Sequence, residues 1–400
     1  MKKSKKFKIL ITVGIIVSMV LLFFAYSYFR VKFAKIEITL VDDLTLEFNT
    51  DKKVSDYIKS INGKIVDDYV IDSTKVGQKQ VKFKFINDDN IKLDYSYKIN
   101  VVDTVSPVVW LGSSYSIAKG SIDNITQKVL CGDNYDSNPK CEIVGDYDLN
   151  TTGVYPLTFK ATDSSGNETL KEFNLRVYEP KKTSGYTSSK TQTLFSDVVA
   201  KHKNENTKIG IDVSGWQKDI DFEKIKNAGV EFIIIKVGGT LGTNKDYYVD
   251  SRFIQNIENA NKYGIDVGLY FFSYAATSKQ AIKDAKWLLK QIKGYDVSLP
   301  IAFDWEDWNN YNSYNLSFFG LTTMAEDFLK VVEDAGYKGM IYGSKNYLEK
   351  IWLETKYDIW LAHYNDTTNY QGNYKFWQIC DDGKVDGIDT PVDINIMYLK

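Results

Sequence analysis

Three acidic residues, Asp304, Glu306 and Asp307, lie close together in the segment SLPIAFDWEDW, residues 298–308. Its apolar run predicts a buried strand, and a buried strand cannot hold unpaired carboxylates. The acids are therefore expected at the strand end, where alternation directs Asp304 and Glu306 to one side. Glycoside hydrolysis needs such a pair, since one carboxyl group must donate a proton while another stays ionised. A lone D-x-E motif is also typical of an ordinary solvated strand end, so the rest of the chain must decide.

Composition limits the kinds of chemistry that are available. Lys and Arg number 50 against 52 Asp and Glu, and a net charge of −2 gives no general case for nucleic acid as a partner. Two histidines, His202 and His363, and three cysteines cannot assemble a His-rich or Cys-based metal site. We therefore expect no metal and no cofactor, and a chemistry carried by carboxyl groups.

The N-terminus is typical of a membrane anchor. Five lysines lie in residues 2–8, and residues 9–29 contain no charge over 21 positions. A run of that length can span a bilayer as a helix, and the lysines place residues 1–8 in the cytoplasm and the remainder outside. The alternative is a cleaved signal peptide with Ala25-Tyr26-Ser27 as its processing site, although the apolar run is longer than usual for one.

Residues 36–178 consist of short alternating runs that predict strands joined by turns. Six positions repeat at an offset of 76 residues, which predicts two copies of one all-β domain, 36–103 and 104–179. The repeated pairs are Gly77 and Gly153, Val81 and Leu157, Phe83 and Phe159, Tyr97 and Phe173, Ile99 and Leu175, and Val101 and Val177. We expect two immunoglobulin-like sandwiches, because the second copy resembles the bacterial immunoglobulin-like domains of surface proteins. Neither copy offers convergent acids, so we expect both to act as spacers.

Three local features of these regions leave alternatives open. The turn at Asp163 could bind calcium, but turns favour its residues in any case. Cys131 and Cys141 are disulfide candidates outside the membrane, with two free thiols as the alternative, whereas Cys380 is expected to be a buried, inert thiol. Residues 180–207 are polar and predict a linker with a short helix near its end.

The third region, residues 208–400, alternates strand-like runs with helical patterns. Eight such runs lie at 209–212, 232–237, 265–270, 300–304, 339–343, 359–362, 376–379 and 392–396, and helices are predicted at 250–263, 278–292 and 321–335. The alternation predicts a closed parallel barrel of the (β/α)8, or TIM, type, with chemistry at the C-terminal ends of the strands. Asp212 ends the first strand and Asp393 lies in the eighth, so closure should bring both to the Asp304–Glu306 pair.

Several segments of this region together resemble glycoside hydrolase family 25. They are GIDVSGWQKDIDFEKIKNAGVEFIIIKVGG (210–239), the D-x-x-F-x-x-N-x-x-x-A segment (250–260), GLYFFSYA (268–275), FDWED, IWLAHY (359–364), FWQI and PVDINIM (391–397). The resemblance implies a lysozyme that cuts between N-acetylmuramic acid and N-acetylglucosamine. It also implies that Glu306 is the proton donor, Asp304 its partner, and Asp212 and Asp393 the remaining acids of the site. The chain departs from many members at Gly238-Gly239, which affects one rim of the cleft.

Aromatic residues support a sugar ligand, because pyranose rings stack on indole and phenol rings. Seven of the eight tryptophans follow residue 208. For each ring singly, core packing is an equally good explanation. The candidates for substrate contact are Tyr270, Trp305, Tyr342, Trp360, Tyr364 and Trp377.

The sequence therefore predicts a membrane-anchored muramidase that acts on the glycan strands of peptidoglycan outside the cell membrane. The alternative is a non-catalytic peptidoglycan-binding or scaffold protein of the cell envelope that holds glycan without cutting it. For either function, partners in an envelope-spanning assembly are possible, and the sequence does not identify them. A chitinase-like barrel is disfavoured because its D-x-x-D-x-D-x-E motif is not matched by PIAFDWED.

Overall fold

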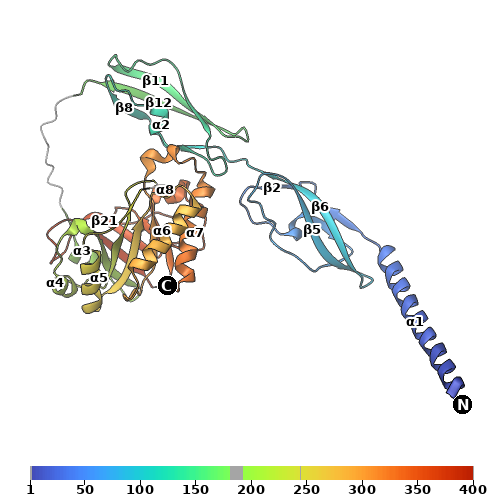
Figure 1. Cartoon of the computed structure of the whole chain (residues 1–400). Coiled ribbons are helices and arrows are strands. Elements are labelled where there is room, and N and C mark those ends of the chain that lie inside the picture. Colours follow the sequence, from blue (N-terminus) through green and yellow to red (C-terminus); the bar gives the residue numbers. More distant parts are fainter. Residues whose placement is uncertain (1, 181–191, 244, 400) are drawn as a thin grey trace. The chain divides into compact units, whose positions relative to one another are not determined.

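The computed structural model describes residues 2–180, 192–243 and 245–399, so residues 181–191 of the predicted linker lie outside the described residues. The chain divides into two compact units, Met1–Thr104 and Val105–Lys400. The first unit begins with α1 (Lys2–Lys32), which Figure 1 shows as a single continuous helix. Its segment Ile11–Lys32 has a mean hydropathy of 2.1 and passes the length and composition test for a membrane span. A signal sequence passes the same test, so both sequence-based alternatives stand.

The rest of the first unit is a small β region. Its elements are β1 (Ile38–Leu40), β2 (Thr45–Glu47), η1 (Val54–Tyr57), β3 (Ile58–Ile61), β4 (Gly63–Ile65), β5 (Gly77–Asn87) and β6 (Lys92–Val102). The strands form a four-stranded sheet in the order β2-β6-β5-β4 and a separate β1–β3 pair. Alternate residues of β5, among them Val81, Phe83 and Phe85, are buried in its core.

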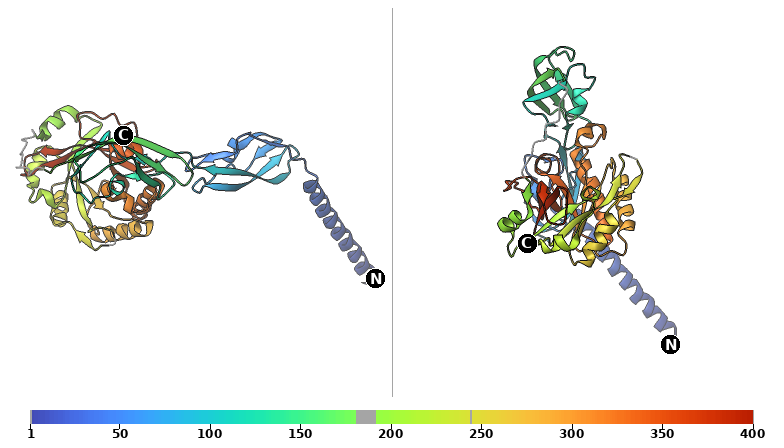
Figure 2. Two further views of the ribbon diagram at one scale, coloured as in Figure 1. Left: turned by 90° about the horizontal axis from the view of Figure 1, so that it is seen from above. Right: turned by 90° about the vertical axis from the view of Figure 1, so that its left-hand side faces the viewer.

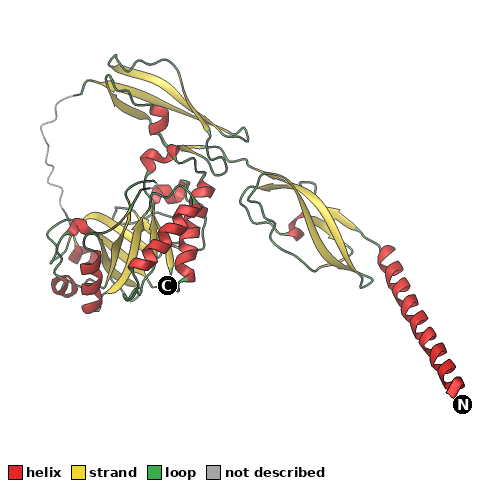
Figure 3. Ribbon diagram, in the orientation of Figure 1, coloured by secondary structure: helices red, strands yellow, loops and turns green. Residues whose placement is uncertain are grey.

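The second unit opens with a similar β region. Its elements are β7 (Val108–Val109), β8 (Ser114–Ala118), α2 (Ile125–Lys128), β9 (Cys131–Gly132), β10 (Lys140–Val144), β11 (Gly153–Thr162) and β12 (Glu168–Tyr178). They form the sheet β10-β11-β12-β8 and the pair β7–β9. The predicted repeat corresponds to the long hairpins β5–β6 and β11–β12 (Figure 3), because Val81 pairs with Tyr97 just as Leu157 pairs with Phe173.

The predicted immunoglobulin-like sandwiches are wrong. Each β region, within the described residues, has one four-stranded sheet and one two-stranded ladder, where an immunoglobulin fold needs two facing sheets with about seven strands in roughly 100 residues. Residues 36–103 are too few for that fold. Alternating hydrophobicity predicted which segments are strands, but it does not specify how many strands each sheet contains.

The remainder of the second unit is a barrel with helices on its outside (Figure 2). Its elements are β13 (Thr193–Leu194), α3 (Phe195–His202), β14 (Thr207–Val213), η2 (Gly215–Gln217), α4 (Phe222–Asn227), β15 (Phe232–Thr240), β16 (Tyr247–Val249), α5 (Phe253–Lys262), β17 (Asp266–Phe272), α6 (Ser278–Gln291), β18 (Ile301–Asp304), η3 (Trp308–Ser313), α7 (Phe318–Asp334), β19 (Gly339–Ser344), α8 (Lys345–Lys350), β20 (Asp358–Ala362), β21 (Phe376–Lys384) and β22 (Val392–Tyr398).

Eight strands close this barrel in the order β14-β15-β17-β18-β19-β20-β21-β22. The strands from β14 to β21 run parallel, but β22 pairs antiparallel with both β14 and β21. The prediction of a (β/α)8, TIM-type barrel is therefore wrong, although the barrel is closed. The physical reason is the connection from β21 to β22, residues 385–391, which is too short for the crossover of a dozen or more residues that parallel strands need.

Side chains that point into the barrel form a separate hydrophobic cluster from those that pack beneath the outer helices. The interior cluster includes Phe232, Ile234, Ala302, Met340, Tyr342, Trp360, Ala362, Phe376 and Met397. Gly210 of β14 makes room for it, because a Cβ atom there would lie 2.3 Å from the carbonyl oxygen of Phe232 and 2.6 Å from its ring. The packing of the barrel interior beneath Asp212 thus requires glycine at position 210.

We predict that Gly210→Ala destabilises the barrel by about 1–3 kcal/mol, because the methyl group would overpack a filled interior. Urea denaturation of the full chain in detergent measures the change. The matched control is Gly112→Ala, where the nearest atom to the new Cβ is 3.8 Å away. An equal effect of the two substitutions would contradict the prediction.

Candidate active site

The barrel brings the four predicted acids to one end of its strands. Asp212 lies near the end of β14, Asp304 is the last residue of β18, and Glu306 follows two residues later. Asp393 lies near the start of β22, and because that strand runs antiparallel, its start lies at the same end of the barrel. Asp212 and Asp393 are directly opposed in the β14–β22 ladder. The four carboxyl groups therefore face a common mouth.

Asp212 is held by two amide side chains, one from the adjacent strand β22 and one from β21 beyond it. Its Oδ2 atom accepts hydrogen bonds from Asn395 Nδ2 at 2.7 Å and from Gln378 Nε2 at 2.8 Å. Burial raises the pKa of Asp212 to about 6, against the lowering effect of these hydrogen bonds. The amides therefore fix the orientation of a carboxyl group that is only 5% exposed.

Asp393 is the partner that keeps a proton. Burial, the charge of Asp212 and a hydrogen bond between the two carboxyl groups raise the pKa of Asp393 to about 9. The same hydrogen bond lowers the pKa of Asp212. The protonated Asp393 thus donates a hydrogen bond to the Asp212 carboxylate, across the β14–β22 ladder that closes the barrel.

Asp304 and Glu306 form the second pair. Asp304 is buried, and its Oδ1 atom has no hydrogen-bond partner among the described residues. Burial, followed by the charge of Glu306, raises the pKa of Asp304 well above its ordinary value. The side chain of Glu306 is exposed at the mouth, where partial loss of hydration raises its pKa, Lys236 lowers it and Asp393 raises it. Because like charges repel, the Asp304–Glu306 pair favours retention of a proton.

Lys236 is a site residue that the sequence analysis missed. It lies on β15 opposite Tyr270 of β17, and its ammonium group lies 4.5 Å from the ring centroid of Phe272. Its charge lowers the pKa values of both Asp304 and Glu306. The signal was present in the sequence, since Phe232 and Ile234 point into the barrel and strand periodicity directs Lys236 to the same side.

Gln378 and Asn395 were also missed, and they connect the aromatic candidates to Asp212. Tyr342 and Tyr364 both donate hydrogen bonds to Gln378 Oε1, at 2.9 and 3.1 Å. Trp360 Nε1 donates to Asn395 Oδ1 at 2.8 Å. Asn395 could have been found from its position two residues after Asp393, on the same face of the last strand.

The six predicted aromatic contacts fall into two groups. Tyr270 and Tyr364 are accessible at the mouth, Tyr364 with 51% of its surface exposed, whereas Tyr342 and Trp360 lie in the barrel interior. Trp305 and Trp377 are buried in the cluster beneath the outer helices, where they donate to the carbonyl oxygens of Ala275 and His363. The structure therefore brings two of the six rings to the mouth of the barrel and two to its interior.

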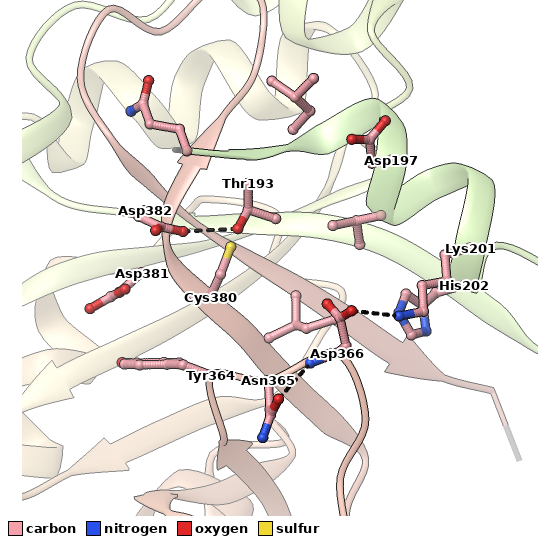
Figure 4. Close-up of a pocket in the computed structure, with 14 residues that line it drawn as sticks. Thr193, Asp197, Lys201, His202, Tyr364, Asn365, Asp366, Cys380, Asp381 and Asp382 are labelled. Atoms are coloured by element: carbon pink, nitrogen blue, oxygen red, sulfur yellow. Dashed lines mark hydrogen bonds and ion pairs between the residues drawn. The ribbon is translucent and has the colours of Figure 1, made fainter. Parts of the chain in front are cut away.

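A polar cavity of about 500 Å³ adjoins Tyr364 on the outer side of β21 (Figure 4). Figure 4 shows Lys201 and Asp366 together at one side of it, where their side chains pair at 3.1 Å. Cys380 lines the cavity as a buried thiol whose pKa burial raises to about 11, which makes it a weak nucleophile. Cys131 and Cys141 are joined by a disulfide, with Cα atoms 6.5 Å apart.

Comparisons with known proteins identify similar sequences and structures. Residues 211–388 match the family described as glycosyl hydrolases family 25. The uncharacterized protein YegX of Escherichia coli K12 is 30% identical over 192 residues, covering 47% of this chain and 68% of its own length. Lysozyme M1 of Streptomyces globisporus is 31% identical over 205 residues, covering 46% of this chain and 66% of its own length. A family 25 glycosyl hydrolase structure from Bacillus anthracis aligns with a TM-score of 0.43 at 22% identity, covering 53% of this chain and 95% of its own.

The barrel and its carboxyl groups thus define an α/β-barrel glycoside hydrolase. The chain belongs to glycoside hydrolase family 25, and it is an enzyme of the lysozyme type. The sequence-based recognition of the family is confirmed. The roles of the individual residues remain predictions.

We predict that Asp393→Asn stabilises the protein increasingly as pH rises. The folded carboxyl group keeps its proton up to about pH 9, whereas the ordinary value is 3.8, so between these values the unfolded chain binds fewer protons. The free energy of unfolding of the wild type therefore falls with pH across this window, and a neutral Asn removes that loss. Thermal unfolding at pH 5, 7 and 9 should show a melting-temperature margin that grows. The control is the exposed Asp389→Asn, and a margin independent of pH would contradict the prediction.

Proposed function

We propose that this chain is a membrane-anchored muramidase that hydrolyses the β-1,4 bond between N-acetylmuramic acid and N-acetylglucosamine in peptidoglycan. One observation carries the proposal: four carboxyl groups, all with raised pKa values, meet at the end of a family 25 barrel where Glu306 alone is exposed. Raised pKa values are what acid catalysis at neutral pH requires. Tyr270 and Tyr364 offer ring faces and hydroxyl groups for a saccharide beside them.

Glu306 acts as the general acid. When the proton of the Asp304–Glu306 pair lies on Glu306, the exposed carboxyl group can transfer it to the glycosidic oxygen as the bond to the anomeric carbon breaks. The adjacent Lys236 lowers the pKa of Glu306, which moderates the effect of desolvation and keeps the proton transferable. After departure of the leaving group, the same carboxylate takes a proton from the attacking water.

Asp304 orients the substrate's own nucleophile. It ends β18 only two residues before Glu306, so it is not placed to attack from the opposite face of the sugar ring. Its buried Oδ1 atom lacks a partner within the described residues and can accept the N–H group of a 2-acetamido substituent. The acetamido oxygen then attacks the anomeric carbon. The Asp212 carboxylate, held by the amides of Gln378 and Asn395 and by protonated Asp393, stabilises the positive charge that develops there.

We predict that Glu306→Gln lowers kcat by about 100- to 10,000-fold, because the amide keeps the shape but cannot donate the proton. Glycan affinity should change little. Turnover of soluble peptidoglycan strands, with mass spectrometry of the new reducing ends, measures both the rate and the bond that is cut.

The matched control for this substitution is Glu354→Gln, an exposed residue that should retain full activity. More than about a tenth of wild-type turnover in Glu306→Gln is more than loss of a general acid allows and would falsify the acid assignment. Normal glycan binding by a wild-type chain that cuts no bond would instead support a binding or scaffold function.

The proposed anchor is α1, with the β regions and the barrel outside the membrane. Its uncharged run is long enough to span a bilayer, and the lysines that precede the run favour a cytoplasmic N-terminus.

We predict that alkaline carbonate leaves the full-length chain in the membrane fraction. Replacing Leu21 and Leu22 by Arg should release the chain, since charges at mid-helix are costly in lipid. Accumulation of active protein lacking residues 1–27 in the medium would contradict the prediction and support a cleaved leader instead.

A further inference from the structure

The second β region contacts the polypeptide segment that follows Glu306. That segment, residues 307–318, contains η3 and leads into α7, and it contacts residues 108–134 of the β region within the same compact unit. We infer that residues 108–134 position Glu306 for catalysis, acting through Asn312 and Trp308. The inference rests on the proposed role of Glu306 as the general acid, and it gives the second β region more than the spacer function that the sequence suggested.

Asn312 is the central polar contact. Its Nδ2 atom donates hydrogen bonds to the carbonyl oxygens of Val129 and Thr126, at 2.8 and 3.0 Å. Its Oδ1 atom accepts from the backbone N–H of Cys131 at 3.0 Å. One amide side chain therefore satisfies three main-chain groups of the β region, which fixes η3 in both position and orientation.

The end of the segment is fixed by main-chain hydrogen bonds. The N–H groups of Phe318 and Phe319, at the start of α7, donate to the carbonyl oxygens of Asp133 and Asn134, at 2.7 and 3.1 Å. The packing here is close. A Cβ atom on Gly132 would lie 2.7 Å from the ring of Phe318 and 2.8 Å from that of Tyr311.

An aromatic column links the β region to the catalytic strand. Trp110 stacks on Tyr347 with ring centroids 4.7 Å apart, and Tyr347 stacks on Trp308 at 4.0 Å. Trp308 meets Trp305 edge to face at 4.9 Å. Trp305 lies between Asp304 and Glu306 in the sequence, so the column ends at the residue that separates the two catalytic candidates. Stacked and edge-to-face rings of this kind stabilise the contact beyond the burial of their surface.

These contacts restrain Glu306 from the side that the barrel does not hold. Asp304, before it, is fixed by β18, whereas Glu306 lies beyond the strand and is tied to the segment by the hydrogen bond from the Trp308 N–H to its carbonyl oxygen, at 2.7 Å. A general acid misplaced by about 1 Å can lose on the order of 100-fold in rate. Loosening the β region should therefore reduce turnover without removing any group that touches substrate.

The first test substitutes Asn312→Ala in the full chain and measures kcat, KM and the pH–rate profile on soluble peptidoglycan strands. We expect kcat to fall by about 10- to 100-fold, KM to stay within about twofold, and the limb of the profile that reports the general acid to shift. The matched control is Asn261→Ala. Asn261 also forms hydrogen bonds with main-chain groups, since it donates to Asp296 O at 2.9 Å and accepts from Asp296 N at 3.3 Å. These contacts lie before the start of β18 and not after its end, where Glu306 is. If the role of Asn312 is purely structural, both substitutions should lower the melting temperature, and the two variants should not differ from each other in kcat or in pH–rate profile.

The second test uses Trp110, which contacts no catalytic candidate. Trp110→Ala should lower kcat by about 10-fold, and Trp110→Phe should restore most of it because the ring stack is kept. Unchanged kcat in both Asn312→Ala and Trp110→Ala overturns the inference. Glu306→Gln in the same assay separates the two proposals: if Glu306→Gln is inactive while those two variants are normal, only the positioning role fails, and if Glu306→Gln is active, the acid assignment fails.

Discussion

Closure of the barrel by β22 is the constraint on which the site depends. This strand is antiparallel to both neighbours, so its first residues lie at the end where the parallel strands finish. Asp393 is consequently placed opposite Asp212, and Asn395, two residues on, reaches the same carboxyl group. A parallel eighth strand would carry its early residues to the opposite end of the barrel. The direction of one strand thus determines whether the acids meet.

Bringing four carboxyl groups together in a poorly hydrated mouth is unfavourable, and the surrounding polar residues offset part of that cost. Gln378 and Asn395 donate to Asp212, while the charge of Lys236 favours the ionised forms of Asp304 and Glu306. The part of the cost that is not offset raises the pKa values of the carboxyl groups, so that protons are retained. The effect is clearest at Asp393, whose pKa is raised to about 9. The raised pKa values are therefore a consequence of the same crowding that makes proton transfer at the mouth feasible.

The sequence predicted the strands, the longer barrel helices and the meeting of the acids, because each depends on local periodicity or on the register of a closed sheet. It failed where the answer depends on partners distant in sequence. Lys236 and Gln378 look like interruptions of apolar strands until the facing residues are known, and Trp305 and Trp377 proved to face the outer helices. The direction of β22 was recoverable from the short connection before it. The number of strands in each β region was not.

The two β regions share a repeated hairpin, and the remaining segments of the second pack on the barrel within one compact unit. The hairpin core is specified by alternating apolar residues, which explains why the repeat was visible in the sequence. The contacts made by Trp110, Asn312 and the 129–134 backbone follow no periodic pattern, because each depends on a single side chain meeting a particular main-chain group or ring. Hydrophobic periodicity therefore identifies the domain, whereas isolated polar and aromatic residues determine what that domain does to its neighbour.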